Sequence, residues 1–156
     1  MKLKLNTDGI SFGTNILSIK VPDHLRRNIA TKMNFLDDAL GGNGFTPSTV
    51  TLFTGEAGAG KTTMAMLMAE NMSKKNLVIF NTGEESLHQV KMTAERLKLK
   101  TGFAAGQETH LPTFLKNVDT IRKQNPDKDC VIIIDSLQCM DDGKYHYTNS
   151  KTPIRV

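Results

Sequence analysis

The sequence predicts an α/β fold built around a parallel sheet. Three segments, residues 49–54, 77–82 and 130–135, are apolar along most of their length, and helical patterns separate them. Apolar strands that alternate with helices are typical of a parallel sheet covered by helices on both faces. With 156 residues, the chain has the size of one domain with a real core.

The remaining elements follow in chain order. Residues 1–30 form a lead-in segment without a clear period, and the core domain is expected over residues 31–156. A short helix is expected over residues 33–42, where Gly41 and Gly42 stop it because glycine readily takes the left-handed conformation of helix ends. Longer helices are expected over 62–72, 86–99 and 111–124, and a short strand over 102–106.

Composition and charge narrow the class of protein. Hydrophobic residues make up 38% of the chain and charged residues 23%, as in an ordinary soluble globular domain. No apolar stretch approaches membrane-spanning length, and the N-terminus lacks the apolar core of a secretory signal. Cys130 and Cys139 form no C-x-x-C pair, which argues against a disulfide or zinc scaffold. We expect a cytoplasmic protein, and its net charge of +4 allows a polyanionic partner.

A glycine-rich motif follows the first predicted strand. The stretch GEAGAGKTT, residues 55–63, matches the full G-x-x-x-x-G-K-[ST] phosphate-loop pattern, with a strand before it and a helix after it. Backbone N–H groups of such a loop and of the following helix bind phosphate oxygens. We expect Lys61 to act in catalysis through its charge at the β- and γ-phosphates, and Thr62 to ligate Mg²⁺. The expected nucleotide-binding residues are Gly55, Glu56, Ala57, Gly58, Ala59, Gly60, Lys61, Thr62 and Thr63.

Asp135 is the second expected metal ligand. It ends the apolar run CVIIID, and ligands of open α/β folds bind at the carboxyl ends of the strands. An aspartate after an apolar run is common, but downstream of a phosphate loop it indicates a carboxylate that holds Mg²⁺ through its water shell. The predicted cofactors are therefore ATP or ADP together with Mg²⁺.

Two adjacent glutamates, Glu84 and Glu85, follow the predicted strand over residues 77–82. That strand ends at the same edge as the phosphate loop, where a carboxylate can act as general base for the water that attacks the γ-phosphate. The alternative is that both are helix-start acids, stabilised by the helix dipole. The alternative suits Glu85, which stands just before Ser86, a possible helix cap. Glu84 remains the candidate base.

Three stretches together resemble a known family. TKMNFLDDALGGNGFTPSTVTLFTGEAGAGKTT, VIFNTGEESLHQVKMTAERLKL and VIIIDSLQ are similar to the core of RecA-type ATPases, most closely the bacterial RadA (Sms) branch. The specific part is the strand-GEES-helix-AERL signature. The resemblance implies a RecA-like P-loop NTPase sheet, ATP hydrolysis, single-stranded or branched DNA as partner, and assembly of copies into a ring or filament. In this family the glutamate after the second strand activates water, and Glu84 is the matching residue.

The chain departs from the RadA pattern at both ends. RadA proteins begin with a four-cysteine zinc module, whereas the N-terminal part of this chain has no cysteine. In RecA-type sheets a strand from later in the sequence separates the phosphate-loop strand from the aspartate strand, and the DNA-binding loops also come later. We therefore expect the N-terminal portion of such a core, or a naturally shortened relative, in which these two strands lack their shared neighbour.

Two functions of different classes are compatible with these motifs. The leading hypothesis is a Mg²⁺-dependent ATPase that acts on DNA in recombination, repair or helicase-like movement, and the chain alone is expected to be an incomplete enzyme. The alternative is a nucleotide-switched assembly or binding protein, similar to KaiC or to recombination mediators, in which hydrolysis is incidental. A small-molecule kinase fits less well, because such kinases lack the strand-borne glutamate. DNA-stimulated ATP turnover separates the first two.

Overall fold

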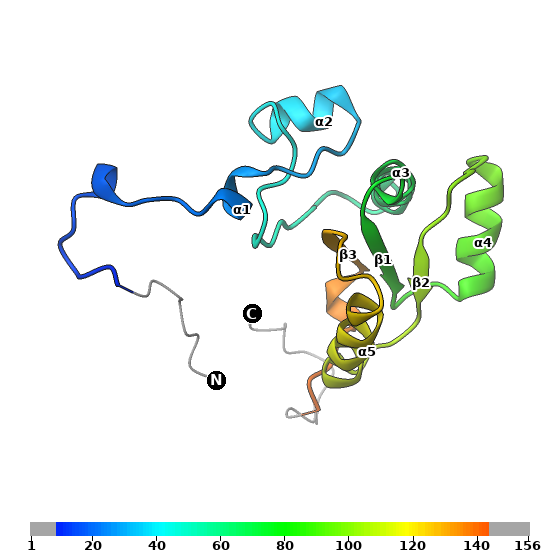
Figure 1. Cartoon of the computed structure of the whole chain (residues 1–156). Coiled ribbons are helices and arrows are strands. Elements are labelled where there is room, and N and C mark those ends of the chain that lie inside the picture. The colour runs from blue at the N-terminus through cyan, green and yellow to red at the C-terminus, as the bar shows by residue number, and fades with distance from the viewer. Residues whose placement is uncertain (1–8, 144–156) are drawn as a thin grey trace.

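The computed structural model describes residues 9–143, and a three-stranded parallel sheet lies at its centre (Figure 1). The strands lie in the order β2-β1-β3 and comprise β1 (Leu77–Thr82), β2 (Ala104–Gly106) and β3 (Cys130–Asp135). The larger helices are α2 (Asn34–Ala39), α3 (Lys61–Ser73), α4 (Leu87–Arg96) and α5 (Leu111–Lys123). Short helical turns are η1 (Ile16–Ser18), α1 (Asp23–Arg26) and η2 (Leu137–Cys139). η1 and α1 belong to an arm that extends away from the sheet (Figure 1).

The pairing of β1 with β3 is the longest in the sheet. It runs through all 6 residues of β1, from Leu77 opposite Cys130 to Thr82 opposite Asp135. Both strands therefore end at the same edge, and the turns that follow them start side by side. The backbone N–H of Gly83 donates a hydrogen bond to the carbonyl oxygen of Asp135 at 2.8 Å, which extends the pairing beyond the strands.

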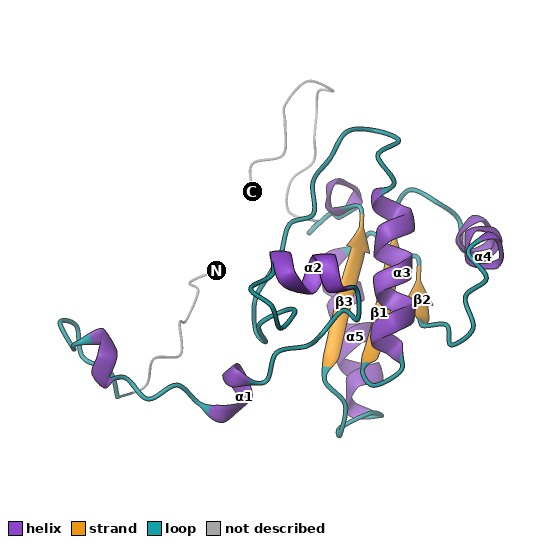
Figure 2. Cartoon of the chain, turned by 90° about the horizontal axis from the view of Figure 1, so that it is seen from above, coloured by secondary structure: helices purple, strands orange, loops and turns teal. Residues whose placement is uncertain are grey.

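The side chains of β1 alternate between two helix layers. Val78 and Phe80 pack in a cluster with the methionines and alanines of α3, whereas Ile79 packs against Phe114 of α5. Figure 2 shows α3 on one side of the strands and α5 on the other. The helix α4 adds Val90 to the α3 cluster. The predicted α/β class, with helices on both faces of a parallel sheet, is confirmed.

Most elements predicted from the sequence are present. The strands over 77–82 and 130–135 form with the expected bounds, and the short strand forms over Ala104–Gly106. The helix expected over 86–99 ends earlier, at Arg96, and Lys98 beyond it has a left-handed φ of 55°. In the described part of the chain, no helix is long and apolar enough to span a membrane.

The predicted strand over residues 49–54 is wrong. The segment is irregular, and its apolar side chains face solvent, with Val50 fully exposed and Leu52 71% exposed. A strand needs a neighbour for its backbone N–H and C=O groups, and within residues 9–143 no strand pairs with this segment or with the outer edge of β3. The apolar pattern favours a strand, but a pattern supplies no hydrogen-bond partner.

Residues 29–45 form a closed segment that packs on the core. Ile29 and Phe45 exchange two backbone hydrogen bonds, of 2.8 and 2.9 Å, and both side chains contact the α3 cluster. Within the segment, the Asp37 carboxylate accepts hydrogen bonds from the backbone N–H and the hydroxyl of Thr31, at 2.7 and 2.8 Å. This segment ties the chain before the phosphate loop to the sheet.

Glu70 is a buried carboxylate on α3 that the sequence analysis did not single out. It is 8% exposed and accepts backbone N–H groups of the loop between α4 and β2, from Lys100, Thr101 and Gly102, at 2.8–2.9 Å. Burial opposes its ionisation, but these donors outweigh burial and lower its pKa below the ordinary value of 4.5. The charged carboxylate thus fixes the loop that leads into β2.

Replacement of this carboxylate by an amide should destabilise the fold in a pH-dependent way. Because the pKa is lowered on folding, Glu70 contributes stability above pH 4.5, and the contribution is lost as the pH falls through the folded-state pKa. We expect Glu70→Gln to lower the free energy of unfolding by about 1–3 kcal/mol at pH 7, measured by urea denaturation. The difference from the unmodified protein should shrink below pH 4.5. A difference independent of pH would contradict this role, and Glu95→Gln, on an exposed residue of α4, is the matched control.

Candidate functional site

The phosphate-loop residues lead directly into α3 at the end of the sheet where β1 and β3 end (Figure 2). Gly58 and Gly60 have φ angles of 77° and 84°, a region in which a side chain is strained. Gly60 is the N-cap of α3 and offers no side chain to cap it, so the first N–H groups of the helix have no intrahelical partner. Residues 55–60 are all exposed. An exposed helix N-terminus of this kind is suited to bind an anion.

Lys61 folds back over the loop that precedes it. Its ammonium group donates hydrogen bonds to the backbone carbonyl oxygens of Gly55 at 2.9 Å and Glu56 at 2.8 Å. The positive charge therefore lies against the phosphate loop, as its expected role requires. Phosphate oxygens would compete with these two carbonyls for the same ammonium hydrogens.

Thr62 and Asp135, the two expected metal ligands, are in direct contact. The Thr62 hydroxyl donates a hydrogen bond of 2.6 Å to Asp135 Oδ2, although the residues are 73 positions apart in the sequence. Hydroxyl and carboxylate oxygens are the ligand types that Mg²⁺ prefers. Within residues 9–143 no group of three or more His, Cys, Asp and Glu side chains could hold a metal ion. Mg²⁺ at this place would need further oxygens from water and phosphate, which is its usual coordination.

Glu84 lies in the turn after β1 and faces the turn after β3. Its carboxylate oxygen Oε1 accepts hydrogen bonds from the Ser136 hydroxyl and from the Gln138 side-chain amide, the latter at 2.9 Å. The side chain remains exposed to solvent. The expected general base therefore lies at the same sheet edge as Asp135, the residue directly before Ser136, and water can reach it.

Glu85 has a different environment. Its backbone N–H and C=O both bond the Thr82 hydroxyl, at 3.0 and 2.9 Å, and its carboxylate oxygen Oε2 is buried without a hydrogen-bond partner in the described part of the chain. The helix α4 is capped by Ser86, which exchanges hydrogen bonds with Gln89 in a capping box. Glu85 therefore lies directly before the helix cap Ser86, as the sequence predicts.

A close approach of two turns holds this arrangement together. A Cβ on Gly83 would lie 2.4 Å from the Cβ of Cys139 and 3.3 Å from its sulfur. The absence of a side chain at Gly83 thus allows the turn that carries Glu84 to lie against η2.

The second cysteine, Cys130, is partly buried, and burial raises the pKa of its thiol although Arg122 acts in the opposite direction.

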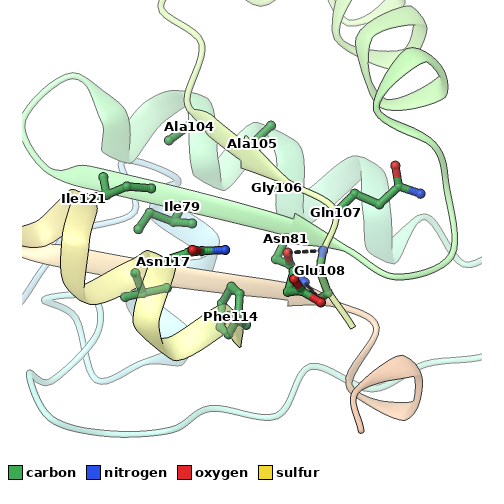
Figure 3. A pocket seen from close by; sticks show the side chains of 11 residues that line it. Ile79, Asn81, Ala104, Ala105, Gly106, Gln107, Glu108, Phe114, Asn117 and Ile121 are labelled. Carbon is green, nitrogen blue, oxygen red and sulfur yellow. Dashed lines mark hydrogen bonds between the residues drawn. The ribbon is translucent and has the colours of Figure 1, made fainter. Parts of the chain in front are cut away.

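A cavity of about 290 Å³ lies away from these residues, between β1, β2 and α5 (Figure 3). Its floor is lined by Ile79 and by the small residues of β2, and Phe114 closes one end. Asn81 faces it, but both atoms of its amide are used: they bond the backbone C=O and N–H of Glu108, at 2.8 and 3.0 Å. No phosphate-loop residue lines the cavity, and we regard it as separate from the candidate site.

The amino-acid sequence of the chain is similar to sequences of known proteins. No protein-family model matches the chain. The chain is similar to part of the DNA repair protein RadA. It is 34% identical to RadA of Streptococcus pneumoniae over 109 residues, 35% identical to RadA of Haemophilus influenzae over 106 residues, and 31% identical to RadA of Mycobacterium tuberculosis over 126 residues.

These similarities cover most of the chain but little of the relatives. They span 67–77% of this chain, whereas they span only 22–24% of the RadA proteins. The chain therefore corresponds to about a quarter of the length of the curated relatives that it matches. A RadA-like relationship follows for this part, and it agrees with the resemblance that the strand, phosphate-loop and glutamate motifs indicated.

The partners that hold Glu84 could not be predicted from the sequence. Ser136 and Gln138 lie in the stretch VIIIDSLQ, but nothing in their spacing indicates a contact with a glutamate 52 and 54 residues earlier. Gly83 gave no signal either, since one glycine after a strand is ordinary. The only available hint was the resemblance, in which all three residues lie within the matching stretches.

An added methyl group at position 83 should force the two turns apart. Gly83→Ala places a carbon atom 2.4 Å from Cys139 Cβ, and we expect a loss of about 1–3 kcal/mol in the free energy of unfolding, measured by chemical denaturation. The loss should be much smaller when Cys139→Gly is already present, because the clashing atoms are then gone. An equal loss in both backgrounds would show that the close contact is not the cause.

Proposed function

We propose that the chain carries the nucleotide-binding part of a RadA-like ATPase, which binds ATP with Mg²⁺ and hydrolyses it in DNA repair or recombination. The observation that carries this proposal is the hydrogen bond of 2.6 Å between Thr62 and Asp135. It joins the end of a complete phosphate-loop motif to the aspartate at the end of β3, which is the pair of oxygens that a Mg²⁺-nucleotide requires.

Each residue has a defined role in this proposal. The free N–H groups at the start of α3 and the loop residues 55–60 bind the phosphates, and Lys61 neutralises their charge. Thr62 and Asp135 would hold Mg²⁺, which supplies charge stabilisation at the phosphates. Glu84 accepts a proton from the attacking water.

The proposed partner is DNA, together with further copies of the same protein. The name of the relatives supports a role in DNA repair, and the net charge of +4 is compatible with a polyanion. DNA should therefore raise the rate of ATP turnover. ATP binding without any turnover by a protein that carries the complete ATPase core, with or without DNA, would instead favour a nucleotide-switched binding protein.

Removal of the loop lysine should weaken nucleotide binding. Lys61→Ala removes the charge that faces the phosphates, so we expect the affinities for ATP and ADP to fall by about ten- to a hundredfold in titration calorimetry. Lys74→Ala is the matched control, because it removes the same charge at the other end of the same helix. Unchanged affinity in a folded Lys61→Ala variant would rule out the phosphate-loop assignment.

The two adjacent glutamates should differ sharply in their effect on turnover. Glu84→Gln keeps size and hydrogen bonding but cannot accept the proton, so ATP should still bind while turnover falls by about a hundredfold or more. Glu85→Gln should change turnover little, because this side chain has no contact with Ser136 or Gln138 among the described hydrogen bonds. Steady-state ATPase rates of both variants, with and without DNA and within a protein long enough to hydrolyse ATP, provide the measurement. Equal losses, or a larger loss at Glu85, would contradict the assignment.

A further inference from the structure

Two turns that are far apart in sequence meet on one oxygen atom of Glu84. The Ser136 hydroxyl and the Gln138 amide nitrogen both donate to Oε1, and within residues 9–143 no hydrogen bond to Oε2 is found. Two donors on one oxygen restrict rotation of the carboxylate. Because the Glu84 side chain is exposed, water can reach the carboxylate, which can accept a proton.

The turn that carries these donors is itself fixed. The Cys139 N–H donates to the Ser136 carbonyl at 3.2 Å, and the Met140 N–H donates to the Leu137 carbonyl at 3.0 Å, which closes the 3-10 turn η2. The close contact of Cys139 with Gly83 then sets this turn against the one that carries Glu84. Gln138 therefore reaches Glu84 from a short, rigid turn and not from a free loop.

We propose that Gln138 is a positioning residue for the Glu84 carboxylate, a role that rests on the proposed ATP hydrolysis. An exposed glutamate samples several rotamers, and most of them point its carboxylate away from the attacking water. The Gln138 amide selects one of them. Because an amide carries no charge and does not titrate, it orients the carboxylate without becoming a proton donor that competes with water.

A purely structural role for Gln138 makes a different prediction. If the Gln138 amide only tied the two turns together, its loss would lower stability and would affect every variant of Glu84 to the same extent. If Gln138 orients a carboxylate that acts as a general base, its loss should lower the ATP turnover rate only while that carboxylate, Glu84, is present. A double-mutant cycle separates these two cases.

The kinetic experiment uses Gln138→Met, which keeps the length of the side chain and removes the amide oxygen and nitrogen. We expect the ATP turnover rate to fall about ten- to a hundredfold with unchanged ATP affinity. In a Glu84→Gln background the same substitution should cause no further loss. Gln124→Met, at an exposed glutamine at the end of α5, is the control and should leave turnover unchanged.

A second readout does not depend on activity. The side-chain amide signals of Gln138 in ¹⁵N–¹H spectra, assigned by their loss in Gln138→Met, should move in Glu84→Ala towards the position of a solvated glutamine amide. They should stay in place in Glu95→Ala, which removes an exposed glutamate of α4. Signals that do not move in Glu84→Ala would overturn the proposal.

The two experiments together distinguish failure of this inference from failure of the proposed function. If Glu84→Gln is inactive while Gln138→Met turns over ATP at the normal rate, or loses equally in both backgrounds, the positioning role is overturned and the ATPase assignment stands. If a protein that carries the complete ATPase core binds ATP but never hydrolyses it, the proposed hydrolysis and the positioning role fall together, and the amide signals then show only a structural contact.

Discussion

The pairing of β1 with β3 is the constraint on which the rest of the site depends. Its register places Thr82 opposite Asp135, so the residues that follow each strand begin at the same height. Glu84 and Ser136 meet for this reason, and Asp135 reaches Thr62 at the same edge. A shift of the register by one residue would turn each side chain of β3 to the opposite face, and these contacts would be lost together.

The chemical groups of the site lie in turns or at the first and last residues of helices and strands, whereas the buried interiors of these elements only place them. β1 is buried almost throughout, and its side chains pack against helices on both faces. The phosphate loop illustrates the same division. Because the segment before it is irregular, its position is set by α3, whose Met66 is completely buried against the sheet. A rigid element on one side of a functional loop is thus sufficient to align Lys61 and Thr62 with the end of β3.

The similarity to RadA and the arrangement of side chains at the sheet edge are separate observations, and both support the proposed function. The relatives match through a region that makes up about a quarter of their length and about 67–77% of this chain. Within residues 9–143 the outer edge of β3 is unpaired, and Val50 and Leu52 are exposed. An unpaired strand edge and exposed apolar side chains each favour further association.

The sequence by itself determined the local structure and the identity of the chemical groups. Apolar runs and helical periods were sufficient for β1, β3, α3 and α5, because these elements bury the faces that their own patterns define. The phosphate-loop motif named Lys61 and Thr62 because it is local. Residues 49–54 show the limit of such reasoning, since a strand pattern forms no strand without a partner. Only the tertiary structure decided that Thr62 contacts Asp135, and that Ser136 and Gln138 hold Glu84. Those contacts depend on strand register and on one missing side chain at Gly83, and neither leaves a pattern in the sequence.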